Sequence, residues 1–365
     1  MQDVLASSVG RAPAAQTEPR RPALVRVALA AVVTLALVAG PAVGLSEAAK
    51  GGGGSQPGGA SKMTYSGQAT GARVSVPPLI DVALSDTGPL PSSGGALEKS
   101  LVEAEVPGVL TAGVLHASTI GQGNESRSEA SAADADLTVA GNTVSADFLM
   151  ARATASCSQG QATVNGSSEI AVLVINGQEI AVTGEPNQTV ELPLGRVVIN
   201  EQTRSPGSIT VNALHVIVNG VADVVVSSAH ADITCAGKPD CSAGTDFVTG
   251  GGWIRTPSGD RGTFAIAGGI KNRGLWGHLS YHDHGTGMKV KGTGVTAYEV
   301  TGLTTRHIEG TAEVNGQPGY TYKVDVSDNG EPGRNDSFSL TLSNGYTAAG
   351  NLVGGNIQLH KPRCK

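Results

Sequence analysis

Apolar and polar side chains alternate with a period of two residues along much of this 365-residue chain. Tyr320, Tyr322 and Val324 would share one face of a strand, and Thr321 and Lys323 the other. Because successive side chains of a strand point to opposite faces, this alternation indicates antiparallel strands with one buried and one solvated face. A chain patterned in this way must build its core from sheets.

Turn signals separate the alternating runs. Pairs of Asn and Gly favour hairpin turns because both residues tolerate positive φ. Such pairs stand at 176–177, 315–316, 329–330 and 344–345, and 257–260 reads Pro-Ser-Gly-Asp. The aromatic fraction is only 3%, so Val, Ala, Ile and Leu must fill most of the core. We predict an all-β protein, with Leu97–Ala104 as its best short-helix candidate.

The aromatic residues divide the chain. Residues 63–235 hold only Tyr65 and Phe148, whereas both Trp residues and the other Tyr and Phe residues follow position 241. The turn-rich stretch 236–240 marks the change. We therefore expect two antiparallel β domains, a sandwich-like one over 63–235 and a small barrel or sandwich over 241–365.

The four cysteines fit this division. Four cysteines allow three pairings, and in an exported protein disulfides are the default. The simplest pairing keeps each bridge within one domain, which joins Cys157 to Cys235 and Cys241 to Cys364. A different pairing, or free thiols, is the alternative.

The N-terminus has the features of an export signal. Arg20, Arg21 and Arg26 precede an uncharged apolar run from Val27 to Leu45. A basic segment, an apolar segment and a small-residue exit predict a signal peptide over 1–44. An uncleaved membrane anchor is the alternative, and the two adjacent arginines raise the twin-arginine route. The Gly-rich residues 45–62 are expected to form a flexible linker.

Charge limits the partners. The formal net charge is −6, and no block of Lys and Arg follows the export segment. Nucleic acids and anionic lipids require clustered positive charge, so we expect neither as a partner, and no membrane attachment once the signal is cleaved. The expected location is extracellular, with the cell surface as a variant.

Three histidines form the sharpest candidate site. His278, His282 and His284 would point to one face if 277–284 is a strand, and imidazoles in this spacing can bind zinc. Ordinary polar positions on a solvated face are the competing interpretation.

A second candidate metal site mimics a calcium loop. Asp325, Ser327, Asn329 and Asp336 supply oxygen donors at suitable spacing, although Asp replaces the usual terminal Glu. A plain hairpin explains most of this pattern. We assign no catalytic residue and no cofactor, with zinc or calcium as the candidate ions.

Several segments together resemble the choice-of-anchor P family of bacterial surface and secreted proteins. Residues 63–235 carry GVLTAGVLHAST (108–119) and VVVSSAHADITC (224–235). The segments DFVTGGGWI (246–254), GHLSYHDH (277–284) and VDVSDNGEPG (324–333) resemble the region that often follows this domain in the family. The resemblance implies an extracytoplasmic, all-β protein without catalytic activity. The chain ends HKPRCK, without the hydrophobic tail or sortase-type motif of anchored members.

The expected function is that of a secreted, non-catalytic envelope or extracellular protein that binds an unknown ligand or serves a structural role. One alternative is a secreted hydrolase that uses the His278, His282 and His284 face. Another is an adhesive module stabilised by calcium.

Overall fold

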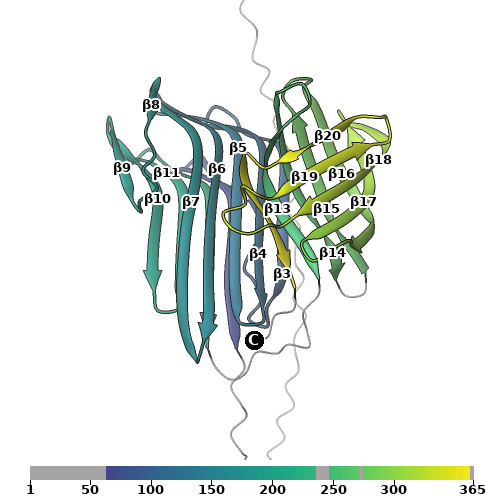
Figure 1. The fold of residues 1–365 in the computed structure, drawn as a ribbon. Helices are drawn as coiled ribbons and strands as arrows, with labels where there is room; N and C mark the ends of the chain where they lie inside the picture. The colour runs from purple at the N-terminus through teal and green to yellow at the C-terminus, as the bar shows by residue number, and fades with distance from the viewer. Residues whose placement is uncertain (1–62, 236–245, 272–273, 362–365) are drawn as a thin grey trace, which may run out of the picture. The chain divides into compact units, whose positions relative to one another are not determined.

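The computed structural model describes residues 63–235, 246–271 and 274–361, which all belong to one compact unit. Every regular element in these residues is a β-strand, so the all-β prediction is confirmed (Figure 1). No helix in this part of the chain is long and apolar enough to cross a membrane. The expected signal segment and linker, and Cys241 and Cys364, lie outside the described residues.

Two six-stranded antiparallel sheets are built from the first twelve strands. The first sheet has the order β2-β1-β12-β11-β10-β9. Its strands are β1 (Thr64–Val76), β2 (Ile80–Asp86), β9 (Gln188–Leu192), β10 (Gly195–Ser205), β11 (Ser208–Val218) and β12 (Ala222–Thr234). The second sheet runs in sequence order from β3 to β8. Its strands are β3 (Gly95–Val106), β4 (Leu110–Gln122), β5 (Glu125–Val139), β6 (Asn142–Ser158), β7 (Gln161–Ile175) and β8 (Gln178–Ile180).

The prediction of a short helix at Leu97–Ala104 is wrong, because these residues lie in β3, which pairs with β4 on both sides of Glu103. Leu, Glu and Ala have good helix propensity, but eight residues are too few for propensity to outweigh a long ladder of cross-strand hydrogen bonds. The strand also lies at the sheet edge. Charged side chains such as Lys99 and Glu105 are typical of exposed edges, where they discourage pairing with other chains.

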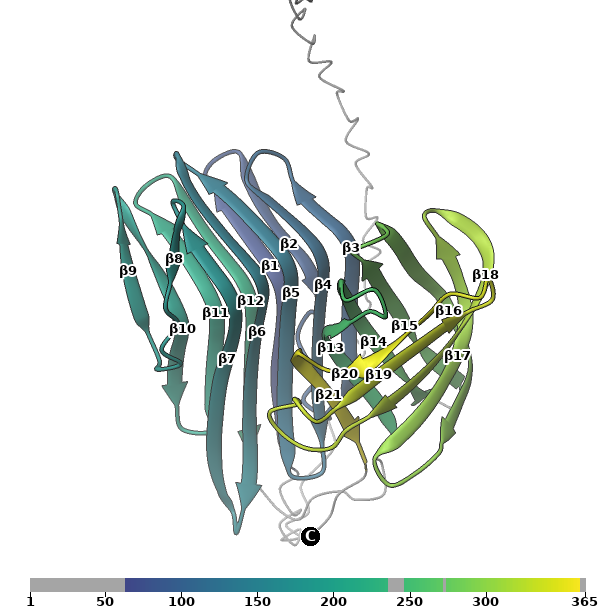
Figure 2. The same cartoon turned by 45° about the horizontal axis from the view of Figure 1, so that its top comes forward.

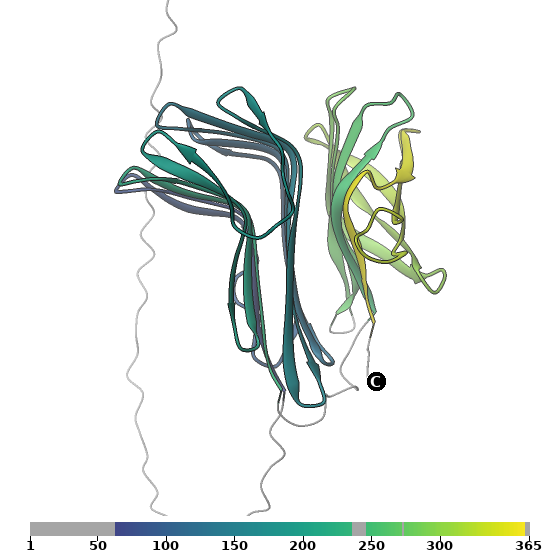
Figure 3. The same ribbon diagram turned by 60° about the vertical axis from the view of Figure 1, so that its left-hand side comes forward.

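Both six-stranded sheets are creased across their strands. At the crease, every second strand has a non-glycine residue with positive φ, a conformation that L-residues rarely adopt. These residues are Glu103 (φ 58°), Asp134 (51°) and Val172 (52°) in the second sheet, and Ser85 (53°), Asn200 (52°) and Ser227 (59°) in the first. The ladder keeps its register on both sides of Glu103, so the bend inserts no extra residue. Figure 3 shows the two sheets bending together.

Small aliphatic side chains fill the space between these two sheets. The core includes Leu115, Leu149, Val211 and Val226, all fully buried, together with many alanines. Tyr65 is the aromatic member among the buried residues of this cluster. Stiff β-branched residues and Ala allow the two sheets to approach closely, in keeping with the low aromatic fraction of this region.

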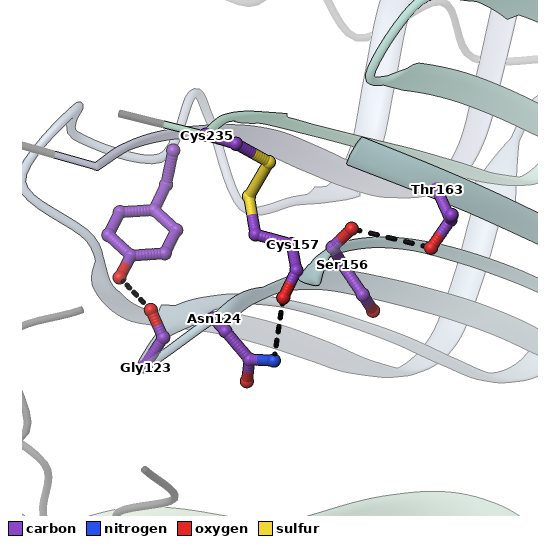
Figure 4. Close-up of a disulfide and its surroundings, with 7 residues drawn as sticks. Gly123, Asn124, Ser156, Cys157, Thr163 and Cys235 are labelled. Carbon is purple, nitrogen blue, oxygen red and sulfur yellow. Dashed lines mark hydrogen bonds between the residues drawn. A yellow bond between two sulfur atoms is a disulfide. The ribbon is translucent and has the colours of Figure 1, made fainter. Parts of the chain in front are cut away.

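The disulfide predicted between Cys157 and Cys235 is confirmed. Cys157 lies near the end of β6 in the second sheet, and Cys235 directly follows β12 in the first. The bridge therefore links the two faces of the sandwich, and the side chain of Asn124 donates a hydrogen bond to the carbonyl of Cys157 at 3.0 Å (Figure 4). It closes a loop of 78 residues.

The remaining strands form one nine-stranded antiparallel sheet with the order β20-β19-β18-β17-β16-β15-β14-β13-β21. Its strands are β13 (Phe247–Arg255), β14 (Arg261–Lys271), β15 (Gly274–Asp283), β16 (Met288–Val300), β17 (Thr305–Val314), β18 (Gln317–Ser327), β19 (Ser337–Leu342), β20 (Thr347–Asn351) and β21 (Gly354–His360). The sheet curves into a half-barrel, which Figure 2 shows in green and yellow. Predicted turns connect β13 to β14, β17 to β18 and β19 to β20, whereas Asn329-Gly330 lies in a longer loop between β18 and β19.

Aromatic side chains fill the concave side of this curved sheet. Phe264 and Phe338 stack with ring centroids 4.0 Å apart, and Tyr281 and Tyr322 are fully buried beside them. A strongly curved sheet encloses more space than two close sheets, and large rings fill that space efficiently. The aromatic shift seen in the sequence thus reflects two different kinds of core.

The nine-stranded sheet lies against the second six-stranded sheet, with β14 and β15 next to β3 and β4. Gly251 on β13 permits the approach. A Cβ at this position would lie 2.7 Å from Oγ of Ser131 and 3.4 Å from the ring of His116. We call this contact region the junction, and it contains the candidate functional residues described next.

Candidate functional site

Strand β15 carries His278 and His282 on the face that meets the second six-stranded sheet, as their contacts show. The sequence predicted that these residues and His284 share a face. Four residues along a strand span about 13 Å, however, which is too far for His278 and His282 to share one ion. The structure instead assigns His278 to one cluster and His282 with His284 to another.

The first cluster, called the Glu98 cluster, consists of Glu98, Ser100, His116 and His278. Oε2 of Glu98 lies 2.6 Å from Nδ1 of His278. The hydroxyl of Ser100 lies 2.5 Å from Nε2 of His278 and 3.0 Å from Nδ1 of His116. One arrangement of protons satisfies both contacts of Ser100, with His116 donating to Ser100 and Ser100 to His278, and it directs the Nδ1–H of His278 toward Glu98.

Burial sets the charge state of this cluster. Burial, together with the neighbouring His278, lowers the pKa of His116 to about 4. Burial alone would raise the pKa of Glu98, but His278 holds that pKa below its usual value. Nε2 of His116 has no hydrogen-bond partner in the described part of the chain. The cluster therefore holds a neutral imidazole and an ionised carboxylate near neutral pH.

The second cluster, called the Asp134 cluster, consists of Asp134, His282 and His284. Nε2 of His284 lies 3.1 Å from Oδ2 of Asp134 and 3.1 Å from the hydroxyl of Thr263. The rings of His282 and His284 are 4.0 Å apart. Asp134 is one of the crease residues with positive φ. Such strained positions occur often at functional sites, because the surrounding structure must hold them in place.

The guanidinium of Arg261 pairs with two carboxylates, one of which belongs to the Asp134 cluster. Arg261 donates to Oδ1 of Asp134 at 2.8 Å and to Oδ2 of Asp147 at 2.6 Å. Burial lowers the pKa of His282 and of His284, and His284 and Arg261 respectively add to these effects. Burial raises the pKa of Asp134, although Arg261 opposes that change. Both imidazoles are therefore neutral at pH 7 and able to act as ligands.

A cavity of about 250 Å³ adjoins this cluster. Asp134 and His282 line it from one side, and Glu103, Gly113 and Lys289 line it from others. Lys289 pairs with Glu103 across the junction. The cavity is open to solvent and combines carboxylates, an ammonium group and an imidazole with apolar surface, so water can occupy it beside these groups.

No family model and no curated protein matches the chain. One solved structure, from Nitrosomonas europaea with the provisional description AttH, aligns over 81% of this chain and 92% of its own length. Its sequence identity is 10% and its TM-score is 0.15, so the likeness supports no inference about fold or function.

A third polar group at the junction carries no histidine. Arg127 contacts Glu129 at 2.5 Å and Glu331 at 2.7 Å, and Asn356 donates to Glu129 at 3.0 Å. Burial opposes ionisation of Glu129, but Arg127 and Arg152 hold its pKa at about 2. This network joins β5 to β21 and to the loop before β19.

The four residues proposed as calcium ligands have hydrogen-bond partners in the protein. Asp325 lies 2.7 Å from Nδ1 of His307. The carboxylate of Asp336 accepts backbone N–H groups of Asn329 and Ile357 at 2.7 and 2.9 Å, and Asn329 donates to the hydroxyl of Ser327. Burial raises the pKa of Asp336 to about 6. These contacts describe a loop closed by hydrogen bonds, with Asp325 directed to a neighbouring strand.

Sequence reasoning missed Glu98, Ser100, His116 and Asp134. These residues precede β15 by well over one hundred positions and share no motif with it. Only the contact between sheets brings them to the histidines, so a local pattern could not reveal them. The GVLTAGVLHAST segment did draw attention to the strand that carries His116.

Proposed function

We propose that this chain is an exported, non-catalytic protein of the bacterial envelope or extracellular space, built to bind a partner or to serve a structural role. The resemblance to the choice-of-anchor P family supports this proposal. So does the Cys157–Cys235 disulfide, because such bridges persist in oxidising compartments and are rare in the cytosol.

The observation that carries the proposal is that several ionisable side chains of the junction pair with each other across it. Arg261 pairs with Asp134 and Asp147, and His278 pairs with Glu98. Each of these pairs joins the nine-stranded sheet to the second six-stranded sheet. Pairs of this kind hold the two sheets in one arrangement, which suits a structural or binding role.

Localisation and redox state test the proposal. The full chain would be expressed in a bacterial host and the cytoplasm, envelope and medium analysed separately. We expect the protein in the envelope or medium, with a Cys157–Cys235 peptide detected by mass spectrometry under non-reducing conditions. Cytoplasmic protein with reduced thiols would overturn the proposal.

A second function is favoured by one observation, the order of groups in the Glu98 cluster. A carboxylate, an imidazole and a hydroxyl follow one another as Glu98, His278 and Ser100, with Ser100 hydrogen-bonded to His278 and Glu98 2.6 Å from the other ring nitrogen, which is the order of groups in a serine hydrolase. Here His278 would act as the general base and Ser100 as the nucleophile. The donor from His116 to Ser100 is an addition to that arrangement.

An active-site label decides between the two functions. A fluorophosphonate probe should modify Ser100 if the hydroxyl is activated, and Ser100→Ala would abolish labelling. On the preferred, non-catalytic function we expect no labelling of the folded protein, and no esterase activity that differs between the native chain and Ser100→Ala. Labelling at Ser100 with turnover would replace the first proposal by the second.

A further inference from the structure

The Asp134 cluster has the donor set of a transition-metal site. It offers one ligand atom each from Asp134, His282 and His284, and these three atoms lie within 4.8 Å of one another. Two imidazoles and a carboxylate suit zinc, which binds nitrogen at about 2.0–2.1 Å and oxygen at about 2.0–2.2 Å. Because Asp134 and His284 are already 3.1 Å apart, a modest movement of His282 would complete a three-ligand face.

A second observation points to a ligand at this place. Oδ2 of Asp134 and Nδ1 of His282 are buried, and neither has a hydrogen-bond partner among the residues the structure describes. His284 is close to Oδ2 but not in hydrogen-bonding orientation. Buried polar atoms are nearly always satisfied, and two neighbouring exceptions in a histidine–carboxylate cluster are what a bound cation would explain.

The surroundings tolerate a cation. Glu103, Asp134 and Asp147 contribute three carboxylates, against two cations from Arg261 and Lys289. Oδ1 of Asp134 is held by Arg261, which leaves Oδ2 as the free ligand oxygen. This is the outer support that metal-binding carboxylates commonly have.

The adjoining cavity supplies the remaining coordination position. Asp134 and His282 line it, so a water molecule there could act as the fourth ligand that zinc requires. Nε2 of His284 would exchange its hydrogen bond with Thr263 for the metal.

We propose that Asp134, His282 and His284 bind one zinc ion, which links the crease of the second six-stranded sheet to the end of β15. Asp134 lies on β5, and His284 directly follows β15. The ion is a structural cross-link at the junction. This goes beyond the proposed function, which stands or falls without it.

The Glu98 cluster is the weaker candidate for the same ion. Ser100 bonds both of its histidines, and Glu98 already pairs with His278. Oε2 of Glu98 and Nε2 of His116 also have no hydrogen-bond partner in the described residues, but an ion there would have to break both contacts of Ser100. In the Asp134 cluster an ion would satisfy two unpartnered atoms and displace only the contact of His284 with Thr263. The two clusters therefore make different predictions for the same titration.

Zinc binding by the full chain, without a histidine tag, tests the proposal. Protein stripped with a chelator would be titrated with zinc chloride by calorimetry at neutral pH, and cobalt(II) would report ligand type by visible absorption. We expect one equivalent of zinc to bind and to raise the melting temperature, and EDTA to reverse the rise.

The informative variant is Asp134→Asn, which keeps the acceptor for Arg261 and removes the ligand charge. It should weaken zinc binding at least ~10-fold, the lower limit seen for changes outside the ligand set, and His282→Ala should do the same. His307→Ala is the matched control, because both nitrogens of His307 face carboxylates of Asp325 and Glu309 outside the junction. It should bind zinc as the native chain does.

Each outcome bears on the proposal. Circular dichroism of the metal-free variants would show that they are folded. Absence of zinc binding by the native chain would overturn the site. So would binding that survives Asp134→Asn and His282→Ala but is lost in His116→Ala, since that result would place the ion in the Glu98 cluster.

Discussion

Arg261 on β14 donates a hydrogen bond from Nη1 to Oδ1 of Asp134 on β5 at 2.8 Å. The same guanidinium reaches Asp147 on β6 and lies over the ring of Trp253, 5.4 Å from its centroid. A single cation thus joins the nine-stranded sheet to two adjacent strands of the second six-stranded sheet. Arg suits this role because its planar, permanently charged group can bond two carboxylates and stack on an indole at once.

Replacing this cation should weaken the fold. Arg261→Met keeps much of the packing but leaves two half-buried carboxylates unpaired, so we expect the free energy of unfolding to fall by about 2 kcal/mol. Urea denaturation measures the loss. The control is Arg73→Met, since Arg73 and Asp81 form an exposed pair with side chains 63% and 68% accessible, and its effect should stay within ~0.5 kcal/mol. Equal losses of stability in the two variants would contradict a stabilising role of the Arg261 ion pairs.

The disulfide should stabilise the sandwich through its long loop. Replacing Cys157 and Cys235 together by Ala releases a 78-residue loop and should lower the free energy of unfolding by up to ~4.5 kcal/mol in the chain-entropy treatment. Guanidinium denaturation of the double variant and of the native chain measures the difference. A loss below ~1 kcal/mol would mean that the unfolded chain is already restricted there.

Acid should weaken the junction through Glu129. Burial opposes its charge, yet Arg127 and Arg152 hold its pKa at about 2, below the value of 4.5 for a free side chain. A carboxylate with a lowered pKa stabilises the fold above pH 4.5, and this contribution is lost as the pH falls from 4.5 toward 2. The native chain should therefore exceed Glu129→Gln in stability at pH 7, and the gap should close in acid. Exposed Glu191→Gln serves as the control.

His215 should give the opposite pH dependence. Burial opposes its charge, but contacts with Glu201 at 2.8 Å and Asp223 at 3.0 Å raise its pKa above 6.5. A base with a raised pKa stabilises the fold fully below pH 6.5, and the contribution disappears as the pH rises through the folded-state value. An NMR titration of the His215 ring should show a midpoint above 6.5. A midpoint at or below 6.5 would contradict the ion pairing.

Gly251 should tolerate no side chain. A Cβ there would lie 2.7 Å from Oγ of Ser131, so Gly251→Ala must displace the buried Ser131 side chain or separate the sheets, and should cost about 1–3 kcal/mol. Gly294→Ala is a suitable control, because its Cβ would meet only Oγ1 of Thr311 at 3.5 Å. Ala in place of Gly in an open strand position should be neutral or stabilising. Thermal unfolding compares the two, and equal melting temperatures would contradict the close approach.

Much of the fold could be predicted because strands and hairpins are local features. Alternation over 320–326 and the Asn-Gly pair at 315–316 correspond to β18 and its turn. The prediction failed at Leu97–Ala104, where helix-favouring residues form an edge strand. It also failed to foresee the crease, since no local signal marks Asp134 or Val172 as positions of positive φ.

The sequence by itself determined the strand pattern and the contrast between an aliphatic and an aromatic core, and it made Cys157–Cys235 the simplest pairing, which the structure confirmed. Side-chain alternation, β-branching and turn residues act over a few positions, and so can be read along the chain. Only the tertiary structure decided which groups surround the histidines of β15. Glu98, His116 and Asp134 reach them from strands far away in sequence, because packing one sheet against another obeys shape and charge rather than sequence order.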